Sequence, residues 1–228
     1  MAELQTKVRR VRAPRSPESL RGQRLSQARL IEAVRSLPRE QFYPAETIGT
    51  IAYDQPVPLE NGSTIPPVPV VALMIGALEL IGSERVLEIG AGSFYQTALL
   101  SRLASEVITI QVDQRAADRA RGALERAGCA NVEVHCGDPR VGWPAKAPYQ
   151  GIIMGAAVSE LPVELIEQLE VGGRLVVALG DRESQLVERL RKRVDGLDSE
   201  TMGCCRLDLL GARERVPSSF PWTNGLKE

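Results

Sequence analysis

Residues 86–100 read VLEIGAGSFYQTALL, and this stretch decides the fold that the sequence predicts. An apolar strand runs into a glycine-containing turn and then into a helix. This order is typical of folds that hold an adenosine-bearing cofactor, because one glycine allows a tight turn and a second lets the backbone approach the ligand. Gly90 and Gly92 fill these two positions, but Phe94 stands where a third glycine is expected.

The spacing of the turn and the end of the next strand both bear on the cofactor. The pattern E-x-G-x-G-x-F, from Glu88 to Phe94, is shorter than G-x-G-x-x-G and suits S-adenosylmethionine better than a pyrophosphate. An acidic residue is expected at the end of the next strand, where it accepts both ribose hydroxyls. Gln111 occupies that position, and its amide lacks the charge that strengthens a carboxylate acceptor. Asp113 is either a shifted substitute or the N-terminal cap of the next helix.

Strands and helices alternate along the central part of the chain. Strands are expected at residues 85–90, 106–112, 131–138, 149–157 and 174–180, and helices at 95–104, 115–128 and 162–173. Strands joined by such helices form a parallel sheet with both faces covered. The expected fold class is therefore α/β, a Rossmann-like doubly wound sheet. Residues 181–212 predict a helix or strand and then further strands, as in an antiparallel edge.

The N-terminal part reads differently. Residues 1–24 carry seven Lys/Arg against two Glu and contain two prolines, so we expect a mobile basic arm. The apolar residues Leu30, Ile31, Val34 and Leu37 recur at helical spacing within residues 25–37. Residues 43–69 are broken by prolines and predict irregular structure, and residues 70–82 predict a helix that ends at a glycine.

Composition excludes several classes of protein. The 228 residues are 43% hydrophobic and 25% charged, and the formal net charge of −1 favours no particular partner. No apolar run is long enough to cross a membrane, and the basic N-terminus lacks the apolar core of a secretory signal. Four cysteines without C-x-x-C spacing indicate reduced thiols in a cytoplasmic protein. The single histidine, His135, is read as a core or rim residue rather than a base.

Several segments together resemble one family. They are REQFYP (39–44), IAYDQPVPLENGSTI (51–65), VALM (71–74), RVLEIGAGSFYQTALLSRL (85–103), NVEVHCGD (131–138), APYQGIIMGAA (147–157) and LPVELIEQLEVGGRLVVALG (161–180). In this order and at this spacing they look like protein-L-isoaspartate O-methyltransferases. No single motif is decisive, but the ordered set is specific.

The resemblance implies a seven-stranded methyltransferase fold that uses S-adenosylmethionine to methylate the carboxylate of isoaspartyl residues in damaged proteins. A carboxylate already reacts with a sulfonium methyl, so the enzyme mainly aligns the two, and no metal is required. Composition and resemblance together predict four regions: a flexible basic arm (1–24), an N-terminal helical and substrate-loop region (25–82), the methyltransferase domain (83–212) and a C-terminal tail (213–228).

The resemblance also assigns the site. The substrate loop falls on residues 62–74. The cofactor-binding positions implied are Glu88, Gly90, Gly92 and Ser93 at the turn, Gln111 or Asp113 at the ribose, and Gly137 and Asp138 beside the adenine.

The sequence departs from the family pattern at the pocket. The serine expected in the substrate loop is Pro66, which has neither a hydroxyl nor a backbone N–H, so Thr64 and Ser63 remain as weak catalytic candidates. Further departures are Phe94 for glycine, Gln111 for the ribose acid, Pro139 for glycine and Gln150 for aspartate. Packing segments such as GGRLVVALG look intact.

Three functions therefore stay open. The first is an active S-adenosylmethionine-dependent O-methyltransferase with a protein or peptide substrate. The second is a catalytically inactive relative that serves as a binding or assembly subunit of a larger protein complex, and the altered pocket favours it. The third is a nucleic-acid methyltransferase, which draws only on the basic segment KVRRVRAPR; aromatic residues are 4% of the chain and an N-P-P-Y motif is absent.

Overall fold

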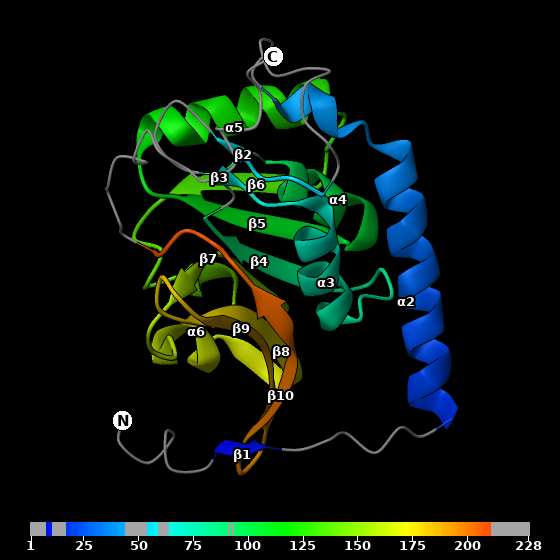
Figure 1. Cartoon of the computed structure of the whole chain (residues 1–228), viewed down its shortest axis with the longest axis vertical. Helices are drawn as coiled ribbons and strands as arrows, with labels where there is room; N and C mark the ends of the chain where they lie inside the picture. The colour runs from blue at the N-terminus through cyan, green and yellow to red at the C-terminus, as the bar shows by residue number, and fades with distance from the viewer. Residues whose placement is uncertain are drawn as a thin grey trace, which may run out of the picture.

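The structure is a computed structural model that describes residues 8–10, 17–43, 54–58, 64–90, 92 and 94–210. Its eight-stranded sheet has the order β1-β10-β9-β8-β7-β4-β5-β6 (Figure 1). The strands are β1 (Val8–Arg10), β4 (Arg85–Ile89), β5 (Glu106–Gln111), β6 (Val132–Cys136), β7 (Tyr149–Val158), β8 (Leu169–Gly180), β9 (Gln185–Arg193) and β10 (Gly196–Cys205). A separate two-stranded ribbon joins β2 (Val57–Pro58) to β3 (Thr64–Ile65).

The topology confirms the predicted doubly wound sheet. Strands β6, β5, β4, β7 and β8 run parallel to one another, β9 and β10 continue the sheet with antiparallel pairings, and β1 pairs in parallel with β10 at the edge. The chain passes from β4 to β5 and β6 on one side and then returns to β7 on the other, so the winding direction reverses at β4. In open α/β sheets, ligands bind at such a reversal, outside the carboxyl ends of the strands.

Helices cover both faces. They are α2 (Pro17–Ser36), α3 (Val68–Leu78), α4 (Tyr95–Leu103), α5 (Gln114–Arg126) and α6 (Val163–Glu167), with short 3-10 turns η1 (Arg39–Phe42) and η3 (Pro144–Lys146). Side chains of α2, α3, α4 and α5 share one hydrophobic cluster, and those of α6 belong to a second. In Figure 1, α2 lies along the outer side of α3 and α4.

Strand β4 is buried on both faces, as expected for a central parallel strand. Val86 points into the first cluster, and Leu87 and Ile89 point into the second. Glu88 alternates with Leu87 and so lies on the face that α3, α4 and α5 cover. A carboxyl group is thus placed at the centre of the sheet.

The structure differs from the predicted arm over residues 1–24, because parts of this segment form a strand and a helix. Val8–Arg10 form β1, which pairs in parallel with β10, and α2 begins at Pro17, inside the predicted arm. Proline is well tolerated in the first turn of a helix, so it starts α2 rather than excluding it. Residues 1–7, 11–16 and 211–228 lie outside the described residues, and the predicted region boundaries remain predictions.

Three further details differ from the sequence prediction. Ile31 of α2 is exposed rather than on the buried face. The predicted helix over 162–173 is only α6, and β8 already begins at Leu169. Helix α3 ends at Leu78, well before Gly82, because Glu79 adopts a left-handed conformation with φ 51°.

A charged cluster explains where α3 ends. The Glu79 carboxylate forms salt bridges with Arg189 at 2.6 Å and with Arg174 at 2.9 Å, and it accepts a hydrogen bond from Gln23 of α2. Desolvation raises the pKa of Glu79, but these partners outweigh it and leave the pKa below its ordinary value. The cluster thereby ties α2 and α3 to strands β8 and β9.

Within the described residues, no helix is long and apolar enough to cross a membrane.

Candidate active site

The glycine turn follows the carboxyl end of β4, where the winding reverses. The Gly90 N–H donates to the Ile110 carbonyl at 3.3 Å, and the Gly137 N–H donates to the Gln111 carbonyl at 2.9 Å. The ends of β4, β5 and β6 are therefore joined side by side. Residues that the sequence placed far apart, at the turn, the ribose position and the adenine position, meet along one edge.

The turn itself uses three left-handed residues in the short segment before α4. Gly90, Gly92 and Phe94 have φ values of 72°, 49° and 67°. The first two are glycines, which adopt this conformation without steric cost. Within the part of the chain that the structure describes, a Cβ added to Gly92 would meet nothing within 4 Å, so these residues leave open space beside Gly92. Ser93, the fourth turn residue of the sequence prediction, lies outside the described residues.

The side chain of Phe94, which stands in place of the third glycine, is buried. Its side chain is 8% exposed and belongs to the first hydrophobic cluster, together with residues of α2, α3 and α4. The ring is therefore packed into the core. The cost is conformational, because a bulky residue at positive φ is strained.

Glu88 anchors the turn from below. Its fully buried carboxylate accepts hydrogen bonds from Thr97 Oγ1 at 2.5 Å and from Gln96 Nε2 at 3.1 Å, both in the first turns of α4. Burial raises the pKa of Glu88, and hydrogen bonds from Thr97, Thr109 and Gln96 oppose that shift. Glu88 therefore joins β4 to α4 beneath the turn.

We expect Glu88→Gln to gain stability relative to the unmodified protein as the pH rises. An acid whose pKa is raised by folding stabilises the fold below its unfolded value of 4.5, and this contribution is lost as the pH rises through the folded pKa. Glutamine can still accept from Thr97 but has no charge to bury. Urea denaturation at pH 4.5 and at about pH 8 measures the difference, and an equal difference at both pH values would contradict the assignment.

Gln111 and Asp113, the two residues predicted to meet the ribose, lie at the end of β5 and just before α5. Gln111 is 5% exposed, and its Nε2 donates to Thr109 Oγ1 at 3.1 Å, which extends the network around Glu88. Asp113 accepts from the Ala116 N–H at 2.7 Å and caps α5. The sequence left two roles open for Asp113, a substitute for the ribose acid and a helix cap, and the structure shows the helix cap.

The end of β6 supplies Gly137 and Asp138. A Cβ on Gly137 would lie in ordinary contact with Ile110 and Trp143, at 3.7 and 3.9 Å. Asp138 is exposed, and its Oδ1 accepts from the Arg140 N–H at 2.9 Å, which fixes the turn that follows β6.

Gly155 is a site residue that the sequence analysis missed. A Cβ at this position would lie 2.2 Å from the carbonyl oxygen of Gly90, a distance that real side chains do not reach. Strand β7 therefore approaches the glycine turn so closely that only glycine fits. A glycine within the apolar run IIMGAA was the available signal, since glycine in a strand marks a close backbone approach.

Thr64, one of the two catalytic candidates, lies in β3. Its backbone N–H donates to Asp208 Oδ2 at 2.7 Å, and partial burial raises the pKa of Asp208. Pro66, two residues further on, is also held in place, because buried Arg39 donates to its carbonyl at 2.8 Å. Ser63, the second candidate, lies outside the described residues.

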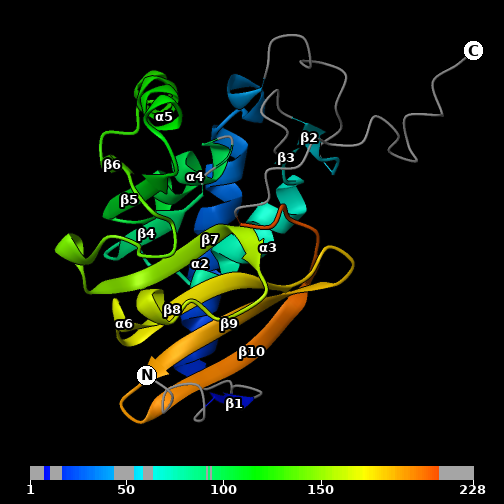
Figure 2. The ribbon, with the colours of Figure 1, turned by 90° about the vertical axis from the view of Figure 1, so that its left-hand side faces the viewer.

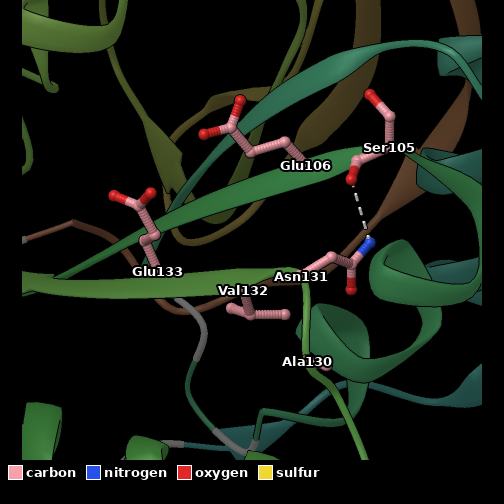
Figure 3. A pocket seen from close by; sticks show the side chains of 6 residues that line it. All are labelled: Ser105, Glu106, Ala130, Asn131, Val132 and Glu133. Carbon is pink, nitrogen blue, oxygen red and sulfur yellow. Dashed lines mark hydrogen bonds between the residues drawn. The ribbon is translucent and has the colours of Figure 1, made fainter.

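A hollow of about 440 Å³ opens elsewhere, and Figure 3 shows its lining by Ser105, Glu106, Ala130, Asn131, Val132 and Glu133. It lies at the amino ends of β5 and β6, opposite the glycine turn. Lys146 Nζ bridges the carboxylates of Glu106, at 3.2 Å, and Glu133, at 2.8 Å. Asn131 donates to the Ser105 carbonyl. These groups already have partners, so the hollow is not the candidate site. In the described part of the chain, no cluster of His, Cys, Asp and Glu could hold a metal ion.

The fold and the turn together define a class: an α/β protein with a glycine turn for an adenosine-bearing cofactor at the carboxyl ends of its strands. The model of the family described as protein-L-isoaspartate(D-aspartate) O-methyltransferase matches residues 17–206. The chain belongs to the protein-L-isoaspartate O-methyltransferase family.

Individual relatives agree with this assignment. Protein-L-isoaspartate O-methyltransferases of Methanoculleus marisnigri and Syntrophus aciditrophicus are 41% and 42% identical to the chain. The alignments cover 84% and 80% of this chain and 88% and 86% of those proteins. A solved protein-L-isoaspartate O-methyltransferase superposes with a TM-score of 0.71 at 26% identity, over 84% of this chain and 66% of that chain. A Plasmodium falciparum structure in complex with S-adenosyl-L-homocysteine, at 17% identity and a TM-score of 0.68, covers 84% of this chain and 99% of that chain and shares the fold.

Proposed function

We propose that the chain is an S-adenosylmethionine-dependent methyltransferase that acts on the carboxylate of isoaspartyl residues in proteins or peptides. The observation that carries the proposal is the state of the glycine turn. Gly90 and Gly92 adopt the left-handed backbone, the residues that the structure describes leave open space beside Gly92, and the ring of Phe94 is buried in the core. Membership of the family supports the same reaction.

The residues present fit the cofactor. Backbone at Gly90 and Gly92 would hold its methionine end, Gln111 would meet the ribose hydroxyls, and Gly137 with Asp138 would lie beside the adenine. When bound, S-adenosylmethionine supplies a methyl group on a positively charged sulfur. Gln111 is a neutral partner, so its hydrogen bond to the ribose would be weaker than that of a carboxylate.

The work left to this chain is alignment. The acceptor carboxylate is itself the nucleophile, so no general base has to remove a proton before the methyl group moves. Thr64, the catalytic candidate among the described residues, lies two residues before Pro66, where the family pattern has serine. The Pro66 carbonyl accepts a hydrogen bond from Arg39. Because Pro66 has no backbone N–H, the residues beside it have to orient the acceptor carboxylate.

The family match gives no support to the alternative of an inactive assembly subunit. A protein or peptide remains the proposed partner, and the cytoplasm the proposed compartment. All four cysteines are free in the structure, which is consistent with a reducing environment.

The test is calorimetric titration with S-adenosylhomocysteine, followed by a methyl-transfer assay on an isoaspartyl peptide. We expect a dissociation constant on the order of micromolar and transfer to the isoaspartyl peptide but not to the matched aspartyl peptide. No heat at millimolar ligand concentration, or equal transfer to both peptides, would overturn the proposal.

Within this test, Asp138→Ala should weaken binding of S-adenosylhomocysteine by about tenfold or more, since a hydrogen bond to a charged group contributes about 1.5–3 kcal/mol. Cys204→Ser is the control, because this exposed residue lies on β10 at the antiparallel edge. Equal effects of the two substitutions would show that Asp138 is outside the cofactor site.

A further inference from the structure

We propose that Asp208 is a positioning residue that holds residues 64–67, called here the acceptor loop, against the end of β7. Residues 64–67 are read as the acceptor side of the site on the basis of the proposed function. The contacts that fix them are independent of that function.

The first contact joins Asp208 to Thr64. The backbone N–H of Thr64 donates to Asp208 Oδ2 at 2.7 Å. Hydrogen bonds to an ionised carboxylate are about twice as strong as those between neutral groups.

The backbone that carries Asp208 is itself fixed to the sheet. The Ala157 N–H donates to the Asp208 carbonyl, and the Leu210 N–H donates to the Ala157 carbonyl, both at 2.8 Å. The amide of Gln185 accepts from the Leu207 N–H at 2.7 Å and donates to the Leu207 carbonyl at 3.0 Å. In Figure 2 the segment after β10 crosses the end of β7, where Ala157 and Leu209 form an isolated bridge. Asp208 therefore projects from a rigid support.

The same support reaches the glycine turn. Ala157 follows Gly155 and Ala156, and both of these lie against Gly90: a Cβ on Gly155 would meet the Gly90 carbonyl, and a Cβ on Gly90 would lie 4.0 Å from that of Ala156. A short chain of contacts therefore runs from the turn through the end of β7 and Asp208 to Thr64. Asp208 sets where the acceptor loop stands relative to the turn.

Other contacts hold the loop as well: Thr64 pairs with Pro58 of β2, and Ile65 is fully buried. Pro66 and Pro67 carry no N–H and cannot donate backbone hydrogen bonds. Arg39 holds the Pro66 carbonyl at 2.8 Å, and Ile65 pairs with Val57 of β2. Loss of the Asp208 contact would loosen the end of the loop at Thr64. Because catalysis here depends on alignment, we expect poorer use of the peptide substrate with little change in cofactor binding.

The experiment compares Asp208→Ala with Asp208→Asn, using the full chain. The asparagine carbonyl can still accept from the Thr64 N–H, whereas alanine cannot. NMR hydrogen exchange at the Thr64 amide reports the anchor without any substrate. The KM for an isoaspartyl peptide and the Kd for S-adenosylhomocysteine then separate the two sides of the site. Asp195→Ala is the matched control, since Asp195 is exposed and bonds only Arg9 among the described residues.

We expect Asp208→Ala to speed exchange at Thr64 and to raise KM, each by about tenfold or more, with Kd for S-adenosylhomocysteine changed by less than about twofold. Asp208→Asn should restore both values to within about threefold of the unmodified protein. Unchanged Thr64 exchange in Asp208→Ala, or no rescue of exchange by asparagine, would overturn the proposal. An absence of S-adenosylhomocysteine binding by the unmodified protein, with the exchange result intact, would instead refute only the proposed function.

Discussion

Gly155→Ala is expected to weaken binding of S-adenosylhomocysteine by about 100-fold, because a displacement of about 1 Å in an aligned site can cost that much. The added Cβ would lie 2.2 Å from the Gly90 carbonyl oxygen, far inside the separation of about 3.5 Å that unstrained atoms keep. Met154 is paired with Ile89 in the sheet, so β7 has little freedom to withdraw. The glycine turn must move instead.

The same substitution should lower the free energy of unfolding by about 1–3 kcal/mol, the usual cost of overpacking. Calorimetry and urea denaturation measure the two effects. Gly122→Ala in α5 is the control, since its Cβ would meet only the end of the Arg126 side chain at 3.4 Å. It should raise stability by about 0.5–1 kcal/mol and leave the dissociation constant unchanged. Wild-type affinity in Gly155→Ala would mean that the turn does not depend on this close approach.

The central fold was predictable because its signals are local. Strands β4 to β7 are short apolar runs, and the helices between them begin and end at residues that the pattern marks, such as Asp113 at the start of α5. The boundaries that failed depend on contacts with distant residues. Helix α3 ends at Glu79 because arginines of β8 and β9 hold its carboxylate. No local pattern contains that information.

The site was predictable in part for the same reason. Spacing placed Gly90, Gln111 and Gly137 at the ends of consecutive strands, and the structure joins them by hydrogen bonds. The sequence did not reveal that Gly155 and Asp208 complete the surroundings of the turn. Their roles come from the approach of β7 to the turn and from the return of the chain after β10. Both are tertiary contacts between segments that lie far apart in the sequence.

Three departures from the family pattern differ in what the structure shows of them. The Gln111 amide donates to Thr109 in the network around Glu88. Pro66 has neither a hydroxyl nor a backbone N–H. Phe94 holds a left-handed conformation, which glycine adopts without strain. The first two therefore change the hydrogen bonds that the edge can offer, and the third places strain in the backbone of the turn.

Phe94→Ala and Phe94→Gly are expected to destabilise the protein by different amounts, and the difference measures the strain at this residue. Removing the buried ring costs about 3–5 kcal/mol in either variant. At φ 67° the alanine variant keeps the steric conflict of its Cβ, about 1–2 kcal/mol, which glycine lacks. Glycine loses about 0.5–1 kcal/mol more conformational entropy on folding, so the glycine variant should be more stable than the alanine variant by about 1 kcal/mol.

The control pair is Leu99→Ala and Leu99→Gly. Leu99 is fully buried in the interior of α4, where glycine should be less stable than alanine by about 1 kcal/mol. Urea denaturation of all four variants should therefore show opposite orders of stability: glycine above alanine at residue 94, and alanine above glycine at residue 99. The same order at both would show that Phe94 does not hold a left-handed conformation in solution. Titration with S-adenosylhomocysteine tests whether the ring also obstructs the ligand. Because the ring is packed in the core, the Kd of Phe94→Gly should stay within about threefold of that of the unmodified protein. A Kd lower by about tenfold or more would place the ring in the path of the ligand.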